Sequence, residues 1–241
     1  MALLTASGLA IAMDRAPVPS TSGQDATTAE LYKDDILKRM RPALESAGGT
    51  SRLYYSIPCK DGEHIIGFPK LRLRLGSHKK TGVAAVQDLF ANDKNVTVSK
   101  ASSGIVRITV GNASRNLLNT RIRLLKLKPH ERYNPIAALL AIEANESVEE
   151  AARKLGLQLP TMVVSEHQVD PAAGIPHLPA VLRDLTLDQA LDAVARTFKG
   201  LVIYGECEGD GRSRFFIIDF AWVVQLYARE GCEEKRLRTG R

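Results

Sequence analysis

Few residues of this chain have the types and the spacing that catalysis needs. Cys59 and His64 are close in sequence and could form a thiolate–imidazole pair, the activated nucleophile of cysteine hydrolases. Such a pair also needs a third residue to orient the imidazole, and none is recognisable nearby. The five histidines lack metal-ligand spacing, and Gly209-Asp210-Gly211 is typical of a turn. The sequence therefore predicts no catalytic residue, no cofactor and no metal ligand, and it indicates that the chain is not an enzyme.

Positive charge is concentrated in two segments of the chain. The whole sequence has a net charge of +6. Residues 70–80 contain five cations and no acid, and residues 115–132 contain six cations and one acid. Each segment thus carries +5, and the rest of the chain is acidic. Local basic segments of this kind predict a surface for an acidic protein, for anionic lipid headgroups or for nucleic acid.

Four arginines in these segments are the candidate partner-binding residues. Leucine and arginine alternate strictly in residues 71–75, so a strand there places Arg72 and Arg74 on one face. A second basic strand is predicted over residues 121–127, where leucines 124 and 125 interrupt the alternation. The planar guanidinium can pair with a partner's carboxylate. We therefore expect a protein partner at Arg72, Arg74, Arg121 and Arg123, where an acidic partner would complement the charge, and we infer no small-molecule substrate.

Nucleic acid is the alternative ligand. Alternating cations on the basic strands 70–80 and 115–132 can follow a phosphate backbone, which would suit a cytoplasmic nucleic-acid-binding protein. Aromatic residues make up only 5% of the chain and none lies between residues 70 and 80 or between 115 and 128. Base stacking on aromatic side chains, as single-strand binders use it, is therefore not supported.

The elements that would position these residues alternate between helices and strands. Apolar residues at helical spacing, with capping residues before them, predict helices, and runs of β-branched residues between turns predict strands. This predicts an α+β protein in which small mixed sheets pack on amphipathic helices. The predicted helices are residues 29–47, 83–90, 135–144, 147–155, 187–198 and 222–227; the predicted strands are 52–57, 64–68, 71–75, 96–98, 105–110, 121–127, 201–204 and 214–220.

The ends of the chain and a proline-rich stretch over residues 159–179 suggest how the chain is divided into domains. Residues 1–28 are predicted to be a disordered leader or a remnant signal peptide, because Ala10-Ile11-Ala12 has the small-x-small form of a cleavage site. The basic region that should precede it is absent. We expect an α+β domain over residues 29–169, a β-α-β-β unit over 170–228 and a charged tail over 229–241.

The chain has three cysteines, and the sequence allows either one disulfide or three free thiols. A disulfide between Cys59 and Cys207 is one reading, which fits an exported chain, and three free thiols are the other. No apolar run approaches the roughly 20 residues that a membrane-spanning helix needs.

A resemblance to a known family is clearest near the C-terminus. The run Leu-Arg-Asp-Leu-Thr-Leu-Asp-Gln-Ala-Leu-Asp-Ala-Val over residues 182–194, followed by Gly-Leu-Val-Ile-Tyr over 200–204, resembles the short N-terminal (STN-like) domain of secretins and TonB-dependent receptors. The resemblance is close over residues 180–220 and loose over residues 70–111. The resemblance implies a periplasmic α+β module that docks partner proteins and has no catalytic residues. The resemblance implies the docking module alone and not the pore or the receptor to which that module is joined in the family.

A shift of the chain by 108 residues suggests an internal repeat. It places Phe90 on Phe198 and Val86 on Val194, and a hairpin follows each helix. Duplication of one β-α-β-β unit is the working interpretation, and chance similarity of two amphipathic helices is the alternative. Together with the resemblance, the sequence predicts a non-enzymatic docking module of the bacterial cell envelope, periplasmic or secreted.

Overall fold

The computed structural model describes residues 33–58, 68–74, 80–113, 115–158, 175–208 and 214–223. All of them belong to one compact unit, Leu31–Arg241. The described part of this unit contains six helices, a mixed sheet of six strands and a separate sheet of two strands. The predicted α+β fold class is confirmed. Within the same residues, no helix is both long and apolar enough to cross a bilayer.

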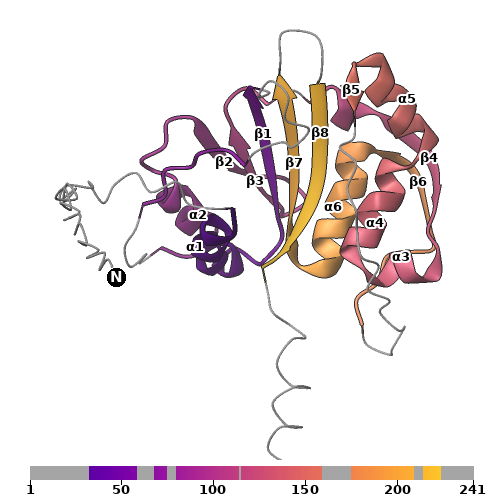
Figure 1. Ribbon diagram of the computed structural model, residues 1–241. Helices are drawn as coiled ribbons and strands as arrows, with labels where there is room; N and C mark the ends of the chain where they lie inside the picture. Colours follow the sequence, from indigo (N-terminus) through magenta and orange to yellow (C-terminus); the bar gives the residue numbers. More distant parts are fainter. Residues whose placement is uncertain are drawn as a thin grey trace, which may run out of the picture. The chain divides into compact units, whose positions relative to one another are not determined.

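The larger sheet has the strand order β2-β3-β1-β7-β8-β5 (Figure 1). Strand β1 pairs in parallel with β3 and β7, so the antiparallel hairpins β2–β3 and β7–β8 flank it. Five consecutive residues of β1 are buried, as expected of a strand covered on both faces. The strands are β1 (Ser51–Pro58), β2 (Val96–Lys100), β3 (Val106–Val110), β5 (Leu157–Gln158), β7 (Gly200–Glu208) and β8 (Arg214–Trp222).

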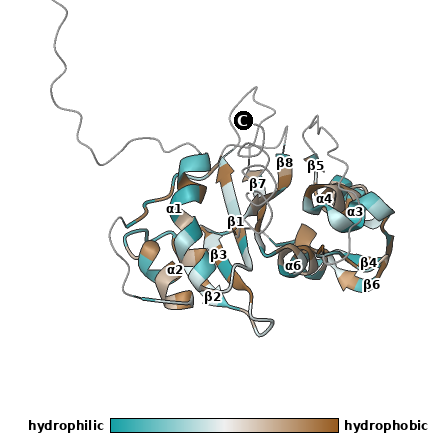
Figure 2. Cartoon of the chain, turned by 90° about the horizontal axis from the view of Figure 1, so that it is seen from below, coloured by the Kyte–Doolittle hydropathy of each residue, from teal (hydrophilic) through white to brown (hydrophobic). Residues whose placement is uncertain are grey.

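Helices pack on both faces of this sheet. Helices α1 and α2 meet Leu53 and Tyr55 of β1 on one face, whereas α4 and α6 meet Tyr54 on the other. The faces alternate because successive side chains of a strand point in opposite directions. Figure 2 shows α1 and α2 on one side of the strands and α4 and α6 on the other. The helices are α1 (Lys33–Ser46), α2 (Val83–Leu89), α3 (Pro129–Tyr133), α4 (Pro135–Glu143), α5 (Glu146–Lys154) and α6 (Leu187–Phe198).

A two-stranded sheet covers the outer side of α4 and α6. Strands β4 (Arg121–Lys126) and β6 (Val181–Thr186) pair antiparallel. Ile122 and Leu125 of β4 point into the core that contains α4 and α6, whereas Leu124 is 40% exposed. The predicted strand over residues 121–127 is confirmed, and the two adjacent leucines mark the break in its alternation.

Helix α6 forms as its sequence predicts. The Thr186 hydroxyl accepts a hydrogen bond from the Gln189 N–H at 3.2 Å, and the Gln189 side chain accepts one from the Thr186 N–H at 2.8 Å. Lys199, in the left-handed conformation with φ 51°, ends the helix. Leu191 and Val194 are fully buried against the sheet. The prediction that this helix lays its apolar side over the adjacent hairpin is confirmed.

The strand predicted over residues 71–75 is wrong for the residues that are described. Residues 71–74 belong to no strand and pack beside α2. The backbone N–H of Arg72 donates to the Asp93 carboxylate at 3.0 Å, and that of Arg74 donates to the Leu89 carbonyl at 2.8 Å. Leu71 is still buried and both arginines exposed. The alternation predicted correctly which side chains face inward. A strand also needs backbone hydrogen bonds to a neighbouring strand, and here the backbone N–H groups bond instead to the end of α2 and to the loop after it.

Other predicted elements agree in part. The helices over residues 83–90, 135–144 and 147–155 and the β2–β3 hairpin are confirmed. The predicted helix from residue 222 begins inside β8, since Trp222 is the last residue of that strand; the rest of it lies outside the described residues. The predicted strand over residues 64–68 is also outside them, except for Phe68.

The two halves that suggested a repeat differ in their placement. Helices α2 and α6 are each followed by a hairpin, but they pack on opposite faces of the sheet. Strand β1 pairs with β3, the second strand of the first hairpin, and with β7, the first strand of the other. The boundary expected near residue 170 lies outside the described residues. Strands from both sides of it share the six-stranded sheet.

Candidate functional site

The largest group of charged side chains lies between α6 and the sheet. Arg52 of β1 and Arg107 of β3 are register partners on adjacent parallel strands, so their side chains lie next to each other. Asp188 and Asp192 are four residues apart on α6 and therefore share one face of the helix. We call Arg52, Arg107, Asp188 and Asp192, with Tyr54 of β1, the arginine–aspartate cluster.

The members of this cluster are paired with one another. The Arg52 guanidinium, which is 0% exposed, donates to the Asp192 carboxylate at 2.8 Å and to the Asp188 carbonyl at 2.9 Å. Arg107 Nη2 lies 2.8 Å from Asp188 Oδ2 and 3.0 Å from Asp192 Oδ2. A buried guanidinium needs a counter-charge, because removing it from water costs several kcal/mol. The cluster therefore joins α6 to both strands.

Tyr54 completes the cluster as a hydrogen-bond donor. Its hydroxyl donates to Asp188 Oδ1 at 2.9 Å, and burial raises the pKa of the phenol well above its usual value. Tyr54 therefore keeps its proton. Three guanidinium groups surround its ring: those of Arg52, Arg107 and Arg115 lie 4.8, 5.9 and 5.1 Å from the centroid. The arrangement is suited to holding elements together, because both carboxylates are bound by arginine and the phenol is a donor.

Sequence reasoning missed this cluster. One signal was available: Arg52 directly precedes the apolar run Leu-Tyr-Tyr of β1, and Asp192 interrupts the apolar face of α6. A charged residue at an inward position needs a partner. The sequence does not say which residue supplies it, because 140 positions separate the two.

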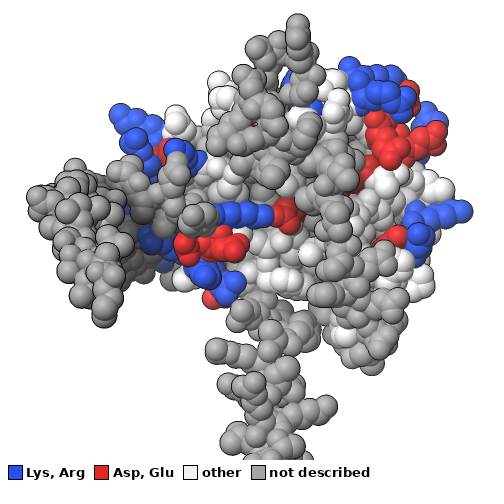
Figure 3. Space-filling view, in the orientation of Figure 1, with Lys and Arg blue, Asp and Glu red and all other residues white. Residues whose placement is uncertain are grey.

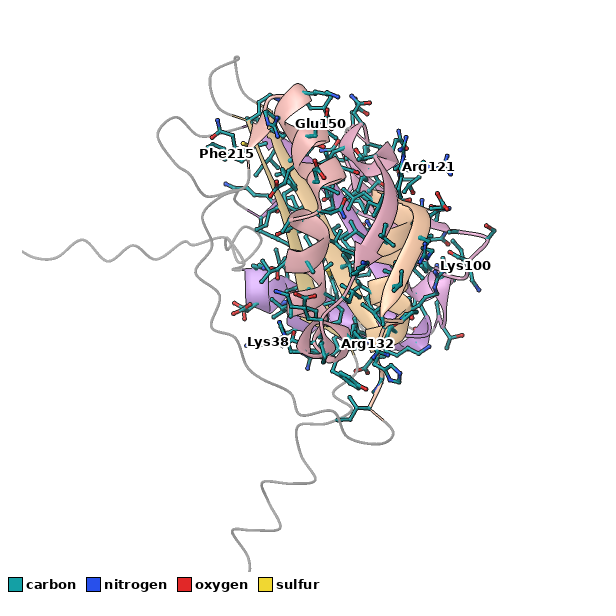
Figure 4. All side chains as sticks on the ribbon, turned by 90° about the vertical axis from the view of Figure 1, so that its right-hand side faces the viewer. Lys38, Lys100, Arg121, Arg132, Glu150 and Phe215 are labelled. Carbon is teal, nitrogen blue, oxygen red and sulfur yellow. The ribbon has the colours of Figure 1, made fainter. Side chains whose placement is uncertain are left out.

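The four arginines predicted to bind a partner lie in two separate places. Arg72 and Arg74 are exposed beside α2, and Arg74 lies 3.2 Å from Asp88. Arg121 and Arg123 are exposed on β4, whose core side chains belong to the opposite face of the large sheet. Figure 4 shows Arg121 at the outer margin of the molecule. The structure therefore does not bring the two pairs together on one surface.

A different basic surface lies at the edge of the large sheet. Residues 94–113, which contain β2, β3 and their connection, carry three cations and no acid; we call them the basic hairpin. Lys94 and Lys100 are exposed and form no ion pair with the described residues. Helix α5 differs, because its acidic and basic side chains lie together (Figure 3) and Lys154 pairs with Glu150 at 2.7 Å.

The outer edge of β2 has no strand partner among the described residues. The Gly111 N–H donates to the Asn95 carbonyl across the hairpin at 2.7 Å. Hydrogen bonding alternates along an antiparallel strand, so the backbone groups of Val98 and Lys100 point away from β3. The Val98 carbonyl already accepts a hydrogen bond of 3.3 Å from the Gln87 side chain. The Val98 N–H and the Lys100 backbone groups have no hydrogen-bond partner among the described residues and can pair with an added strand.

The opposite edge of the sheet is covered in part. Strand β5 pairs with Arg214 and Phe215 of β8, and α4 covers the strand further along. Glu143 of α4 is 5% exposed, and the backbone of Ile218 hydrogen-bonds to its carboxyl group. Burial raises the pKa of Glu143 to about 8, the Ile218 hydrogen bond opposes that rise, and the charge of Asp219 adds to it. A largely protonated side chain therefore occupies this edge at neutral pH.

Cys207 on β7 is disulfide-bonded, and its partner lies outside the described residues. Among the described residues, no three His, Cys, Asp or Glu side chains lie close enough to hold a metal ion. Comparison of the chain with protein-family models, curated proteins and solved structures finds no match.

Proposed function

We propose that the chain is a non-enzymatic docking module of the bacterial cell envelope, which binds a protein partner through a basic surface. The observation that carries the proposal is the basic hairpin, in which Lys94 and Lys100 are exposed beside a sheet edge that has no strand partner among the described residues. The arginine–aspartate cluster supports it as well. Its charged groups bind one another and hold α6 on the sheet, which gives the hairpin a rigid support.

The Cys207 disulfide supports a place in the envelope. Disulfides persist in oxidising compartments such as the periplasm and are rare in the cytosol. The resemblance of residues 180–220 to the short N-terminal domain of secretins and TonB-dependent receptors points to the same compartment.

The oxidation state of Cys207 in cells tests the location. Trapping of free thiols in growing cells should leave Cys207 unmodified, and reduction before trapping should expose it. Cys59→Ser and Cys232→Ser variants identify the partner, because the correct one frees Cys207. Loss of the disulfide should lower the free energy of unfolding by roughly 2–4 kcal/mol. A fully modified Cys207 without reductant would contradict an envelope location.

The partner class is tested by photo-crosslinking in cells of the natural host. A photoreactive residue at position 100 should crosslink to a protein in the envelope fraction, and one at Lys38 on α1, which is also exposed, serves as the control. Crosslinks from position 100 to DNA or RNA would favour the nucleic-acid-binding alternative and would overturn the proposal.

A further inference from the structure

We propose that the open edge of β2 binds an extended acidic segment of the partner, which adds to the sheet as a further strand. This inference rests on the proposed docking function and names the site and the chemistry of its ligand. Main-chain hydrogen bonds supply the affinity in this mode of recognition, and flanking side chains supply the specificity.

The backbone of β2 presents the groups that strand addition needs. Val98 offers its N–H, and Lys100 offers both its N–H and its carbonyl, all directed away from β3. The Gln87 side chain occupies the Val98 carbonyl by a hydrogen bond of 3.3 Å at the exposed surface. A single exposed hydrogen bond of this kind is worth about 1 kcal/mol, so an incoming strand can displace it.

The charges beside this edge select an acidic occupant. Lys94 precedes β2 and Lys100 ends it, and both are exposed. In Figure 4, Lys100 lies at the margin of the molecule. Acidic side chains at either end of an added strand would meet these ammonium groups. A second copy of β2 would instead bring lysines toward lysines, which disfavours pairing of two copies at this edge.

The two faces of β2 favour an alternating occupant. Val96 and Val98 are half-buried and pack against the core that contains α2, whereas Thr97 and Ser99 are exposed on the other face. A strand added beside β2 continues both faces. The expected ligand thus alternates apolar and polar residues and has carboxylates toward its ends.

A synthetic peptide tests this inference directly. The probe alternates valine and threonine, carries a glutamate at each end and is labelled for fluorescence anisotropy. It should bind the intact protein in low salt, and binding should weaken as salt rises, because exposed charges are screened. In amide NMR spectra, the largest shifts should fall on Val98 and Lys100.

Three changes separate strand addition from general charge attraction. Lys94→Glu with Lys100→Glu should weaken binding by about tenfold, because two attractive rim charges become repulsive. Val98→Pro should weaken it similarly, since it removes an outward N–H while proline is tolerated on edge strands. A probe methylated on alternate backbone nitrogens should also bind about tenfold more weakly. Unchanged circular dichroism and melting temperature confirm that the variants fold.

The control variant is Lys126→Glu on β4 with Arg183→Glu on β6, which reverses the same number of exposed charges elsewhere. It should leave binding unchanged. If it abolishes binding and the β2 variants do not, strand addition at β2 is wrong while the docking function stands. Equal affinity for the methylated probe, or no binding of either probe, also overturns the inference. Tighter binding of single-stranded DNA than of any acidic peptide would overturn the docking function itself.

Discussion

The arginine–aspartate cluster and the basic hairpin use the same kinds of residue in opposite ways, and Arg107 belongs to both. In the cluster, Arg52 is fully buried and its charge is matched by Asp192. At the hairpin edge, Lys94 and Lys100 are exposed and form no ion pair with the described residues. A cation that is paired with a carboxylate of the same fold stabilises that fold. A cation without such a carboxylate can instead bind a carboxylate of a partner.

The largest expected effect lies in the cluster. Asp192→Ala removes the carboxylate to which the buried Arg52 guanidinium donates at 2.8 Å and leaves only the Asp188 carboxylate, 3.4 Å away. The free energy of unfolding, measured by urea denaturation, should fall by about 3 kcal/mol. Arg52→Met combined with Asp192→Leu removes both charges and should recover much of that loss. If Asp192→Ala costs less than about 1 kcal/mol, the cluster does not hold α6 on the sheet.

Glu143 extends the comparison to a buried acid, which forms no ion pair with the described residues. Its folded pKa of about 8 exceeds the ordinary value of 4.5, so the folded state holds the proton more tightly. The resulting stability is fully present below pH 4.5 and is lost as pH rises toward 8, by at most about 1.4 kcal/mol per pH unit.

Glu143→Gln should flatten this slope, because glutamine does not titrate and can still accept the Ile218 hydrogen bond. The measurement is the free energy of unfolding of both proteins from pH 4.5 to 8.5. An exposed carboxylate changed in the same way, Glu149→Gln, is the control and should leave the slope unaltered. Parallel curves for wild type and Glu143→Gln would contradict the raised pKa.

The smallest effect on stability is expected at the hairpin. Lys94→Gln and Lys100→Gln remove exposed charges that have no described partner, so the free energy of unfolding should change by less than about 0.5 kcal/mol. The same variants should weaken binding of the acidic probe. A loss of stability as large as that of Asp192→Ala would show that these lysines are structural, and the contrast between the two regions would fail.

Local features of the fold were predictable from the sequence. The capping residues Thr186 and Gln189 and the apolar spacing after them predicted α6, and Asn134 followed by Pro135 predicted the start of α4. The segment of residues 71–74 was predicted less well. Its leucines and arginines do alternate between inside and outside, but the pattern alone could not show that α2 and the loop after it, rather than a strand, lie beside it.

The candidate site depended on contacts that no local pattern encodes. The sequence selected exposed arginines at residues 72, 74, 121 and 123, and the fold separates them. It passed over Lys94 and Lys100, because their value depends on β2 being an edge strand, which follows only from the complete strand order.

The sequence by itself determined most of the helices, several of the strands and which of their side chains face inward, because caps, turns and periodicity act over a few neighbouring residues. Only the tertiary structure decided that β1 lies between two hairpins, that Arg52 meets Asp192, and that α4 covers part of β8 while β2 has no strand partner among the described residues. Desolvation and pairing of charges depend on residues far apart in the chain, and folding alone brings those residues together.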